Sequence, residues 1–149
     1  MAVVYGSAGF RYTLLTALAL RLEAAGIGKW STTPGASETA ITIDALPATP
    51  DRGIAMTLYP VSDDGGTDTT IGLQLRFRGP AGNRSAVLNL IDQVFDNLHG
   101  LKNTDWANIP IVQVLHTSGA YLGTDGNNRS EHSENYYITL TRPGTHRED

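Results

Sequence analysis

The segment from Thr70 to Arg78 restricts the fold of this chain more than any other part of it. Apolar side chains stand at every second position, with small or polar side chains between them: Ile71, Leu73, Leu75 and Phe77, alternating with Gly72, Gln74, Arg76 and Arg78. Because successive side chains of a strand point to opposite faces, this alternation is typical of a strand with one buried face. The chain is therefore expected to build a sheet on a hydrophobic core, with the polar residues of this segment on a face open to solvent or to partners.

Shorter patterns predict the other strands and the turns. The segment from Gly53 to Tyr59 alternates in the same way, and the polar, glycine-containing residues 60–69 predict that it forms a hairpin with a long connection. Further strands are expected at 40–45, 109–117 and 135–142, with 120–124 as an extension or a short edge piece. Loops or turns are expected at 28–39, 46–51 and 125–128.

An amphipathic helix is predicted from Phe10 onward, because apolar residues recur there at three- and four-residue steps. These residues are Leu14, Leu15, Leu18, Leu22 and Ala25. Ser7 is suited to cap the N-terminus of this helix. Gly26 is suited to the left-handed conformation that ends a helix, with Ile27 as the apolar contact after it.

A second helix is predicted to start at Arg84 or Ser85 and to stop at Gly100. Its expected core-facing stripe consists of Val87, Leu88, Ile91, Val94, Phe95 and Leu98. Polar residues fill the opposite side, a pattern typical of a helix that packs one face on a core. The segment that follows, which contains Trp106, is expected to be a loop.

The elements thus follow in the order helix, strands, helix, strands, without internal repeats or a linker long enough to divide the chain. This order favours an α+β fold with a mainly antiparallel sheet and both helices packed on one face of it. The length of 149 residues suits one domain. We therefore expect a single domain over residues 1–149, with 143–149 as a frayed tail.

The composition limits the classes of function. Charged residues make up 17% of the chain, below the usual level of about 25%, so its surface exposes uncharged groups that neighbours in an assembly can cover. The formal net charge of −4 argues against wrapping of nucleic acid, although it suits the wall of a passage for DNA. The absence of cysteine excludes disulfides and thiolate chemistry. No apolar run approaches the length of a membrane span, so no membrane partner is expected.

No pattern indicates a catalytic, cofactor or metal site. The segment Gly6-Ser7-Ala8-Gly9 precedes a helix and lacks the strand-to-helix setting of a nucleophile elbow. Two acidic or histidine-containing groups lack the ligand spacing of zinc or calcium sites: His116, Glu131, His132 and Glu134, and Asp63, Asp64 and Asp68. The strand-to-helix segment from Gly79 to Arg84 lacks the lysine of a phosphate loop. We therefore predict no catalytic residue, metal or cofactor.

The candidate functional residues are instead those suited to an interface. They are Asp63, Asp64, Gln74, Arg76, Arg78, Arg84, Arg129 and Tyr137. Arg76 and Arg78 share the outward face of one strand, and either Tyr136 or Tyr137 must point away from the core because they are adjacent in a strand. A merely solvated strand face is the alternative. The substitution Arg76→Glu distinguishes an interface from a solvated face, because it impairs assembly only if that face is buried between subunits.

Two stretches resemble a known family of phage proteins. The first runs from Met56 to Asp64 and continues through the 72–78 strand and the 85–101 helix, and the second runs from Ser130 to Pro143. Together with the N-terminal helix they cover most of the chain. They resemble the small proteins encoded between the head and tail genes of siphophages, which are tail terminator or minor capsid (head-tail joining) proteins.

The resemblance implies a structural virion protein without a cofactor, made in the cytoplasm of the bacterial host and located in the neck region of the tail. Such proteins form a ring, a hexamer, on the head-proximal end of the tail tube. The ring stops tube polymerisation and offers a docking surface to the head-tail connector, while DNA passes through its lumen. Subunits are expected to join through sheet edges or open strand faces, and the loops 28–39, 60–69 and 123–134 to contact the tail tube protein and the connector proteins.

Other functions stay open at this point. A head-completion or stopper protein of the connector would serve the same neck region. A subunit resembling the tail tube would too, although tube subunits are mostly strands with one helix. From other classes, a small metal-dependent enzyme would use the group of His116, Glu131, His132 and Glu134, and a ligand-binding domain would need a pocket that no pattern indicates.

Overall fold

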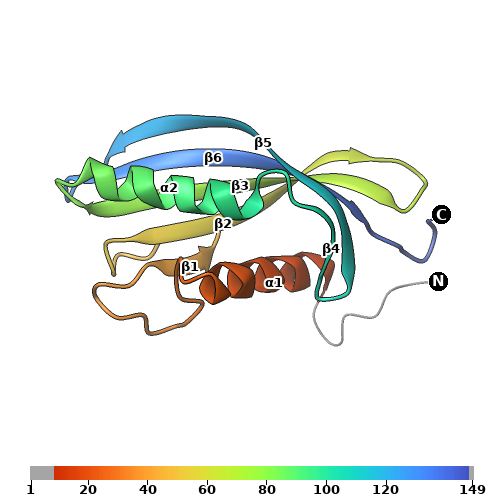
Figure 1. Cartoon of the computed structure of the whole chain (residues 1–149), viewed down its shortest axis with the longest axis horizontal. Coiled ribbons are helices and arrows are strands. Elements are labelled where there is room, and N and C mark those ends of the chain that lie inside the picture. Colours follow the sequence, from red (N-terminus) through yellow and green to blue (C-terminus); the bar gives the residue numbers. More distant parts are fainter. Residues whose placement is uncertain (1–8, 148–149) are drawn as a thin grey trace.

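A computed structural model describes residues 9–147 of the chain (Figure 1). Its elements are α1 (Phe10–Ala24), β1 (Ala40–Ile43), β2 (Gly53–Asp63), β3 (Asp68–Ala81), α2 (Arg84–Leu98), β4 (Lys102–Trp106), β5 (Ile109–Thr124) and β6 (Arg129–Thr141). Strands and helices alternate in blocks along the chain, as the sequence predicts, and the α+β class agrees with the structure. Among the described residues, no helix combines the length and the apolar character needed to cross a membrane.

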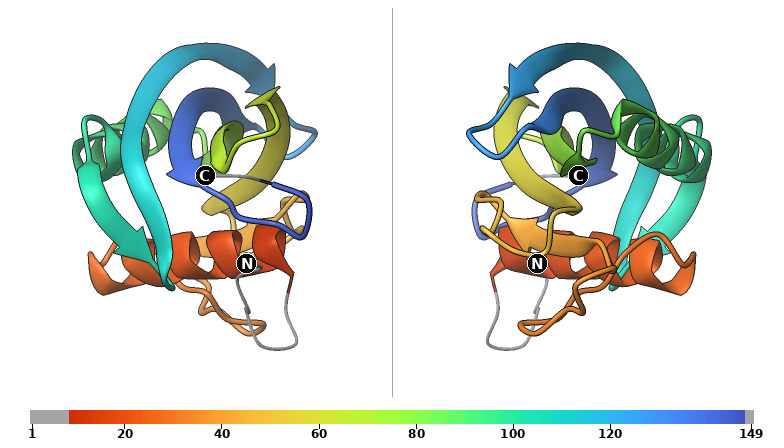
Figure 2. Two further views of the ribbon diagram at one scale, coloured as in Figure 1. Left: turned by 90° about the vertical axis from the view of Figure 1, so that its right-hand side faces the viewer. Right: turned by 90° about the vertical axis from the view of Figure 1, so that its left-hand side faces the viewer.

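The strands form one mixed, curled sheet in the order β1-β2-β3-β6-β5-β4. β1 pairs with β2 in parallel, whereas the pairs β2–β3, β3–β6, β6–β5 and β5–β4 are antiparallel. The curl brings the two outer strands toward each other, and α1 contacts both of them, β1 and β4, while α2 contacts β3, β5 and β6 (Figure 2). The sheet therefore wraps around its helices, which do not lie as one layer on a flat face.

One hydrophobic cluster joins the inner side of this sheet to both helices. The alternating residues that predicted a half-buried strand all belong to it: Ile71, Leu73, Leu75 and Phe77 are 0–3% exposed. Leu14, Leu18 and Leu22 join it from α1, at 0–1% exposure. Truncation of such a leucine to alanine costs roughly 2–5 kcal/mol, because the transfer free energy is lost and a cavity remains. The period-two and helical patterns thus identified the core directly.

The end of α1 follows the predicted glycine stop. Gly26 has a φ of 77°, and its N–H donates to the Glu23 carbonyl at 2.9 Å, while the Ile27 N–H donates to the Leu22 carbonyl at 3.0 Å. These two bonds define a Schellman motif, and Ile27 is buried next to it, as predicted. At the other end Gly9 occupies the cap position. The predicted cap, Ser7, lies outside the described residues.

The predicted stripe of α2 is wrong in part. The helix is capped by the Asn83 side chain, which accepts from the Ala86 N–H at 3.2 Å, and it buries Val87, Leu90, Ile91, Val94 and Leu98. Leu88 and Phe95, predicted to face the core, are 49% and 37% exposed. The core-facing sector is rotated toward Leu90. Phe95 lies on the opposite flank, where its ring stacks on His99 at 4.6 Å and meets the ring of His116 on β5 at 5.6 Å.

Several segments predicted as loops are strands. Residues 102–106 form β4, joined to β5 by Ala107 and Asn108, whose φ values of 50° and 66° are those of a type I′ hairpin turn without its usual glycine. β2 and β3 extend to Asp63 and from Asp68, so the predicted connection 60–69 is shorter than expected. β6 starts at Arg129, so the predicted loop 123–134 is largely strand. Pro60 is tolerated in β2 because β1 does not reach that part of the strand.

Candidate assembly surfaces

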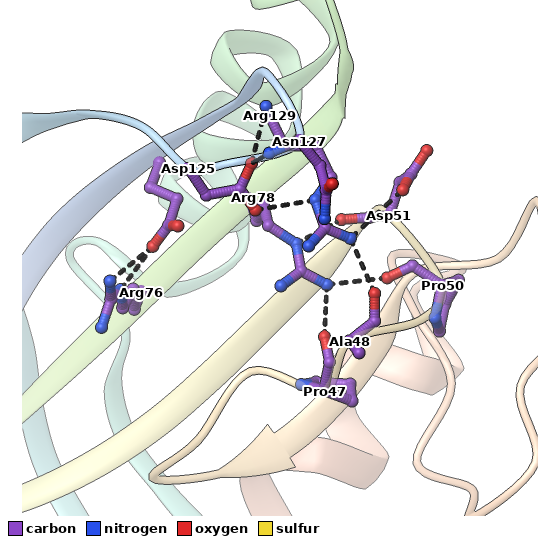
Figure 3. A network of polar contacts seen from close by, with 10 residues as sticks. Pro47, Ala48, Pro50, Asp51, Arg76, Arg78, Asp125, Asn127 and Arg129 are labelled. Atoms are coloured by element: carbon purple, nitrogen blue, oxygen red, sulfur yellow. Dashed lines mark hydrogen bonds and ion pairs between the residues drawn. The ribbon is translucent and has the colours of Figure 1, made fainter.

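Arg78, expected on the open face of β3, is buried instead. Only 4% of it is exposed, and its guanidinium donates to three backbone carbonyls of the segment between β1 and β2 (Figure 3). The acceptors are Pro47 at 2.5 Å, Pro50 at 2.8 Å and Asp51 at 2.8 Å. Burial, followed by the nearby charge of Arg129, lowers the pKa of Arg78. The Arg78 side chain therefore stabilises the 47–51 segment of its own chain.

Arg129, another predicted interface residue, lies beside Arg78 and holds the same segment. It is 6% exposed and donates to the Ala48 carbonyl at 2.7 Å, to Asp51 Oδ1 at 3.2 Å and to Asp125 Oδ2 at 2.8 Å. The Arg129 N–H also donates to Asp125 Oδ1 at 3.0 Å, and this bond is the largest cause that lowers the pKa of Asp125. For Arg129 itself burial lowers the pKa, but Asp125 and Asp51 outweigh it and raise the value.

We call Arg78, Arg129, Asp51 and Asp125 the arginine clamp. It fixes residues 44–52, which connect two adjacent parallel strands, β1 and β2. Parallel neighbours usually need a crossover of a dozen or more residues. This shorter connection brings the carbonyls of Pro47, Pro50 and Asp51 onto Arg78, on the outer face of β3. The guanidinium groups donate to these carbonyls through hydrogen bonds that are buried at Pro50 and partly buried at Pro47, Ala48 and Asp51.

The other three candidates of the sheet lie on its outer face, away from the helices. Gln74 is exposed, Tyr137 is 39% exposed and the Arg76 side chain is 51% exposed, with its Nε donating to Glu131 Oε1 at 2.8 Å. Register places Gln74 and Arg76 two residues apart on β3, and Tyr137 beside Gly72 on β6. The structure thus leaves these three exposed on the outer face, whereas Arg78, two residues beyond Arg76 on the same face, is covered by residues 47–51.

A cross-strand row of apolar side chains crosses this outer face. Leu115, Tyr137, Gly72 and Tyr59 are successive partners on β5, β6, β3 and β2. The Tyr59 ring covers Gly72 so closely that an added Cβ would lie 2.2 Å from it. Burial, and then the neighbouring Tyr137, raise the pKa of Tyr59. The glycine is therefore required by the tyrosine packed on it, and the row is a mildly apolar strip on a polar face.

Asp63 and Asp64 lie at the β2–β3 hairpin, at the end of the sheet opposite the start of α2 (Figure 1). Asp63 Oδ1 accepts from the Thr69 hydroxyl at 2.6 Å and from Arg147 Nη1 at 3.2 Å. The Thr69 bond is the largest cause that lowers the pKa of Asp63, and Arg147 adds to it. Asp64 accepts from the Gly66 N–H at 2.7 Å, a bond that shapes the turn.

Arg84 lies on the helix side of the sheet, apart from the outer face. Its Nη2 donates to the Tyr121 hydroxyl at 2.9 Å, and its guanidinium carbon is 5.0 Å from the centre of that ring. The ring of His132 is 5.1 Å from the same tyrosine. Burial is the main cause that lowers the pKa of His132.

The group considered for a metal-dependent enzyme divides between the two faces. His116 Nε2 is 3.6 Å from Glu134 Oε2 on the helix side, whereas Glu131 pairs with Arg76 on the outer face. The buried Tyr136 hydroxyl next to this pair has no hydrogen-bond partner among the residues that the structure describes, and burial raises its pKa. Among residues 9–147, no three histidine or acidic side chains are placed to hold a metal ion.

A cleft of about 530 Å³ lies between α1, the 30–34 loop and β1. Tyr12, Trp30, Pro34 and Ile43 contribute to its lining. The sequence indicated no aromatic-lined pocket, because these residues come from separate segments with no common pattern.

Two strand edges have no partner within the described part of the chain. β1 pairs with β2 only from Gly53 to Met56, so the remainder of β2, Thr57–Asp63, has a free outer side, which we call the β2 edge. β4 pairs with β5 only as far as Gln113, and the contacts of residues 99–101 end at His116. The remainder of β5, Thr117–Thr124, has a free outer side, which we call the β5 edge. The prediction that 120–124 extends the 109–117 strand is confirmed by β5, but no sequence pattern showed which parts of β2 and β5 would lack a neighbour.

The chain was compared with known proteins. The family model described as bacteriophage tail terminator protein matches residues 21–142. No curated protein matches the chain. Among solved structures, a chain from the "Virion of native gene transfer agent (GTA) particle" superposes with a TM-score of 0.53 at 16% identity, over 87% of this chain and 90% of that one, which shows a shared fold. Because the family model spans all six strands, α2 and the end of α1, the protein belongs to the bacteriophage tail terminator family.

Proposed function

We propose that this protein is a structural virion subunit that ends the tail tube. Copies of it form a ring on the head-proximal end of the tube, stop its polymerisation and offer the surface on which the head-tail connector docks. DNA passes through the lumen of the ring, for which six copies are our working number. The observation that carries the proposal is the match of the tail terminator family model to residues 21–142.

The surfaces of the chain support a role in assembly. The outer sheet face carries the exposed Gln74, Arg76 and Tyr137, and two strand edges find no partner in the described part of the chain. Such features suit a protein whose neighbours complete it. The net charge of −4 suits a lumen through which DNA slides without being held.

The segments that project from the sheet are the proposed contacts to tube and connector. They are the 28–39 loop, the tip of the β2–β3 hairpin at 64–67 and the β5–β6 turn at 125–128. The last two are much shorter than the loops expected from the sequence, so their contacts involve fewer residues. Asp64 belongs to the hairpin tip, and Arg129 supports the turn from inside through Asp125.

Electron microscopy of particles made without this protein tests the proposal. We expect tails of uncontrolled length and heads without tails, because nothing would stop the tube or receive the connector. Particles with tails of normal length that fail only to join heads would indicate the connector stopper instead. Normal virions would refute both functions. For the outer face, Arg76→Glu is expected to reduce ring formation, and normal tails in that variant would show that this face is not an interface.

A further inference from the structure

We propose that neighbouring copies join by strand pairing, with the β5 edge of one copy antiparallel to the β2 edge of the next. The sheet then continues from subunit to subunit. This inference rests on the proposed function only in taking the assembly to be a ring. It assigns the contact between copies to Thr117–Thr124 on one side and to Thr57–Asp63 on the other.

The β5 edge lacks the usual protection of an exposed strand. Its sequence, TSGAYLGT, contains no charged residue and no proline. Tyr121 and Leu122 are 48% and 49% exposed. Soluble proteins commonly guard such edges with lysine, proline or a covering element, because unpaired N–H and C=O groups bind other strands. Its two register irregularities, at His116/Ser118 and Tyr121/Gly123, leave Ser118–Tyr121 as a regular stretch between them. This edge is suited to receive a strand.

The short outer strands determine the direction of pairing. β4 covers the first half of β5 and β1 covers the first half of β2, so each free edge is the second half of its strand. In a parallel arrangement β4 of one copy and β1 of the next would occupy the same end of the joint and collide. In an antiparallel arrangement they lie at opposite ends, and the two free halves, eight residues and seven residues long, fit together.

The two edges differ from each other, so the joint is head-to-tail. The β2 edge contains Pro60, which lacks an N–H donor, and an irregular register between Pro60 and Ser62. Two β2 edges facing each other would therefore lack two donors, whereas a β2 edge facing a β5 edge lacks one. Figure 1 shows the edges at opposite ends of the sheet, since β5 ends near the start of α2 and the β2–β3 hairpin projects from the other end. Joints between unlike patches build rings or filaments and do not stop at a dimer.

Cross-linking between engineered cysteines tests this joint. The chain has no cysteine of its own, so every disulfide between copies involves an engineered position. Centring the two edges on each other places Ser118 opposite Ser62, and both serines are exposed. Within one copy, β6 and β3 separate these strands, a distance of roughly 14 Å. A disulfide needs Cα atoms within about 7 Å. Any bond between positions 62 and 118 therefore joins two copies.

The experiment uses particles that carry the Ser62→Cys/Ser118→Cys chain, oxidised or treated with a short bismaleimide that tolerates a slip of one residue pair. On non-reducing gels we expect a ladder of multimers of this chain. Each single-cysteine variant is expected to stay monomeric. The matched control combines Ser118→Cys with Ser37→Cys, another exposed serine, in the 28–39 loop, and is expected to give no ladder.

Two results would overturn the inference. One is a double variant that is present in the particles but does not cross-link with either reagent. The other is Ser118→Cys alone giving dimers, which would mean that two β5 edges meet. Both leave the proposed function intact, because the chain is still in the particle. Absence of the unmodified chain from purified particles would instead contradict the proposed function itself.

Discussion

The arginine clamp and the β5 edge both contain backbone polar groups that are not paired within the sheet, and the chain satisfies these groups in only one of the two regions. At the clamp, an irregular segment lies over the outer face of the sheet, and two guanidinium groups satisfy its carbonyls. At the β5 edge, one side of the strand backbone has no partner within residues 9–147. A buried carbonyl must accept a hydrogen bond within the chain, whereas an exposed carbonyl binds water until another chain replaces that water. Charge has therefore been placed where the chain needs internal support and is absent from the β5 edge, where we propose that a neighbour binds.

The largest expected effect comes from breaking the clamp. Arg78→Ala leaves the carbonyls of Pro47, Pro50 and Asp51 without their donor, and we expect a loss of about 3 kcal/mol in the free energy of unfolding. Urea denaturation measures it. Arg76→Ala, two residues away on the same strand, is the control and should cost less than about 1 kcal/mol, because its ion pair is exposed. Equal losses in the two variants would show that the clamp adds no stability.

A charge on the β5 edge should act on assembly and not on folding. Ala120→Lys places an ammonium group in the middle of the exposed edge, so we expect few completed tails but a free energy of unfolding within about 0.5 kcal/mol of the original. Tail completion is counted by electron microscopy. The control is Val112→Lys, on the half of β5 that β4 already covers, at 42% exposure. If both variants complete tails equally well, the edge is not the joint.

The dependence of stability on pH tests the contribution of the clamp, through Asp125. Because the pKa of Asp125 is lowered in the folded state, its contribution is complete above its ordinary pKa and is lost as the pH falls through the lowered one. Asp125→Asn should therefore be less stable near neutrality, and the gap to the original chain should close on acidification. Unfolding curves across pH 2–7 measure this. A constant gap would assign the effect to lost hydrogen bonds alone.

The smallest expected effect concerns Gly72 on the outer face. Gly72→Ala puts a methyl group into the space of the Tyr59 ring, which must rotate away, and we expect a loss of roughly 1 kcal/mol. The double variant with Tyr59→Ala removes the clash and should recover part of that loss relative to Tyr59→Ala alone. Thermal unfolding of the single and double variants gives the coupling free energy. A coupling near zero would mean that the ring moves without cost.

Local pattern predicted the parts of the fold that depend on local sequence. The alternation at 71–77 and the stripe and glycine stop of α1 were confirmed, because burial selects side chains at the period of the element. β4 was missed since Lys102, Asn103 and Asp105 show no apolar alternation and its turn lacks glycine. The exposure of Leu88 and Phe95 was missed because both flanks of α2 are apolar and only the packing of the helix on the sheet distinguishes them.

Arg76 and Arg78 mark the boundary between what the sequence determined and what only the tertiary structure decided. The sequence determined that both side chains leave β3 on the side opposite the core, because the strand period fixes direction. Which of them remains exposed depends on residues 47–51, distant in sequence, which the parallel pairing of β1 and β2 brings over Arg78 alone. The free strand edges arise in the same way, since each exists only because its neighbour, β1 or β4, is shorter than the strand it covers. The face to which a side chain points is a local property of the backbone, whereas its burial depends on which distant segments of the chain pack over it.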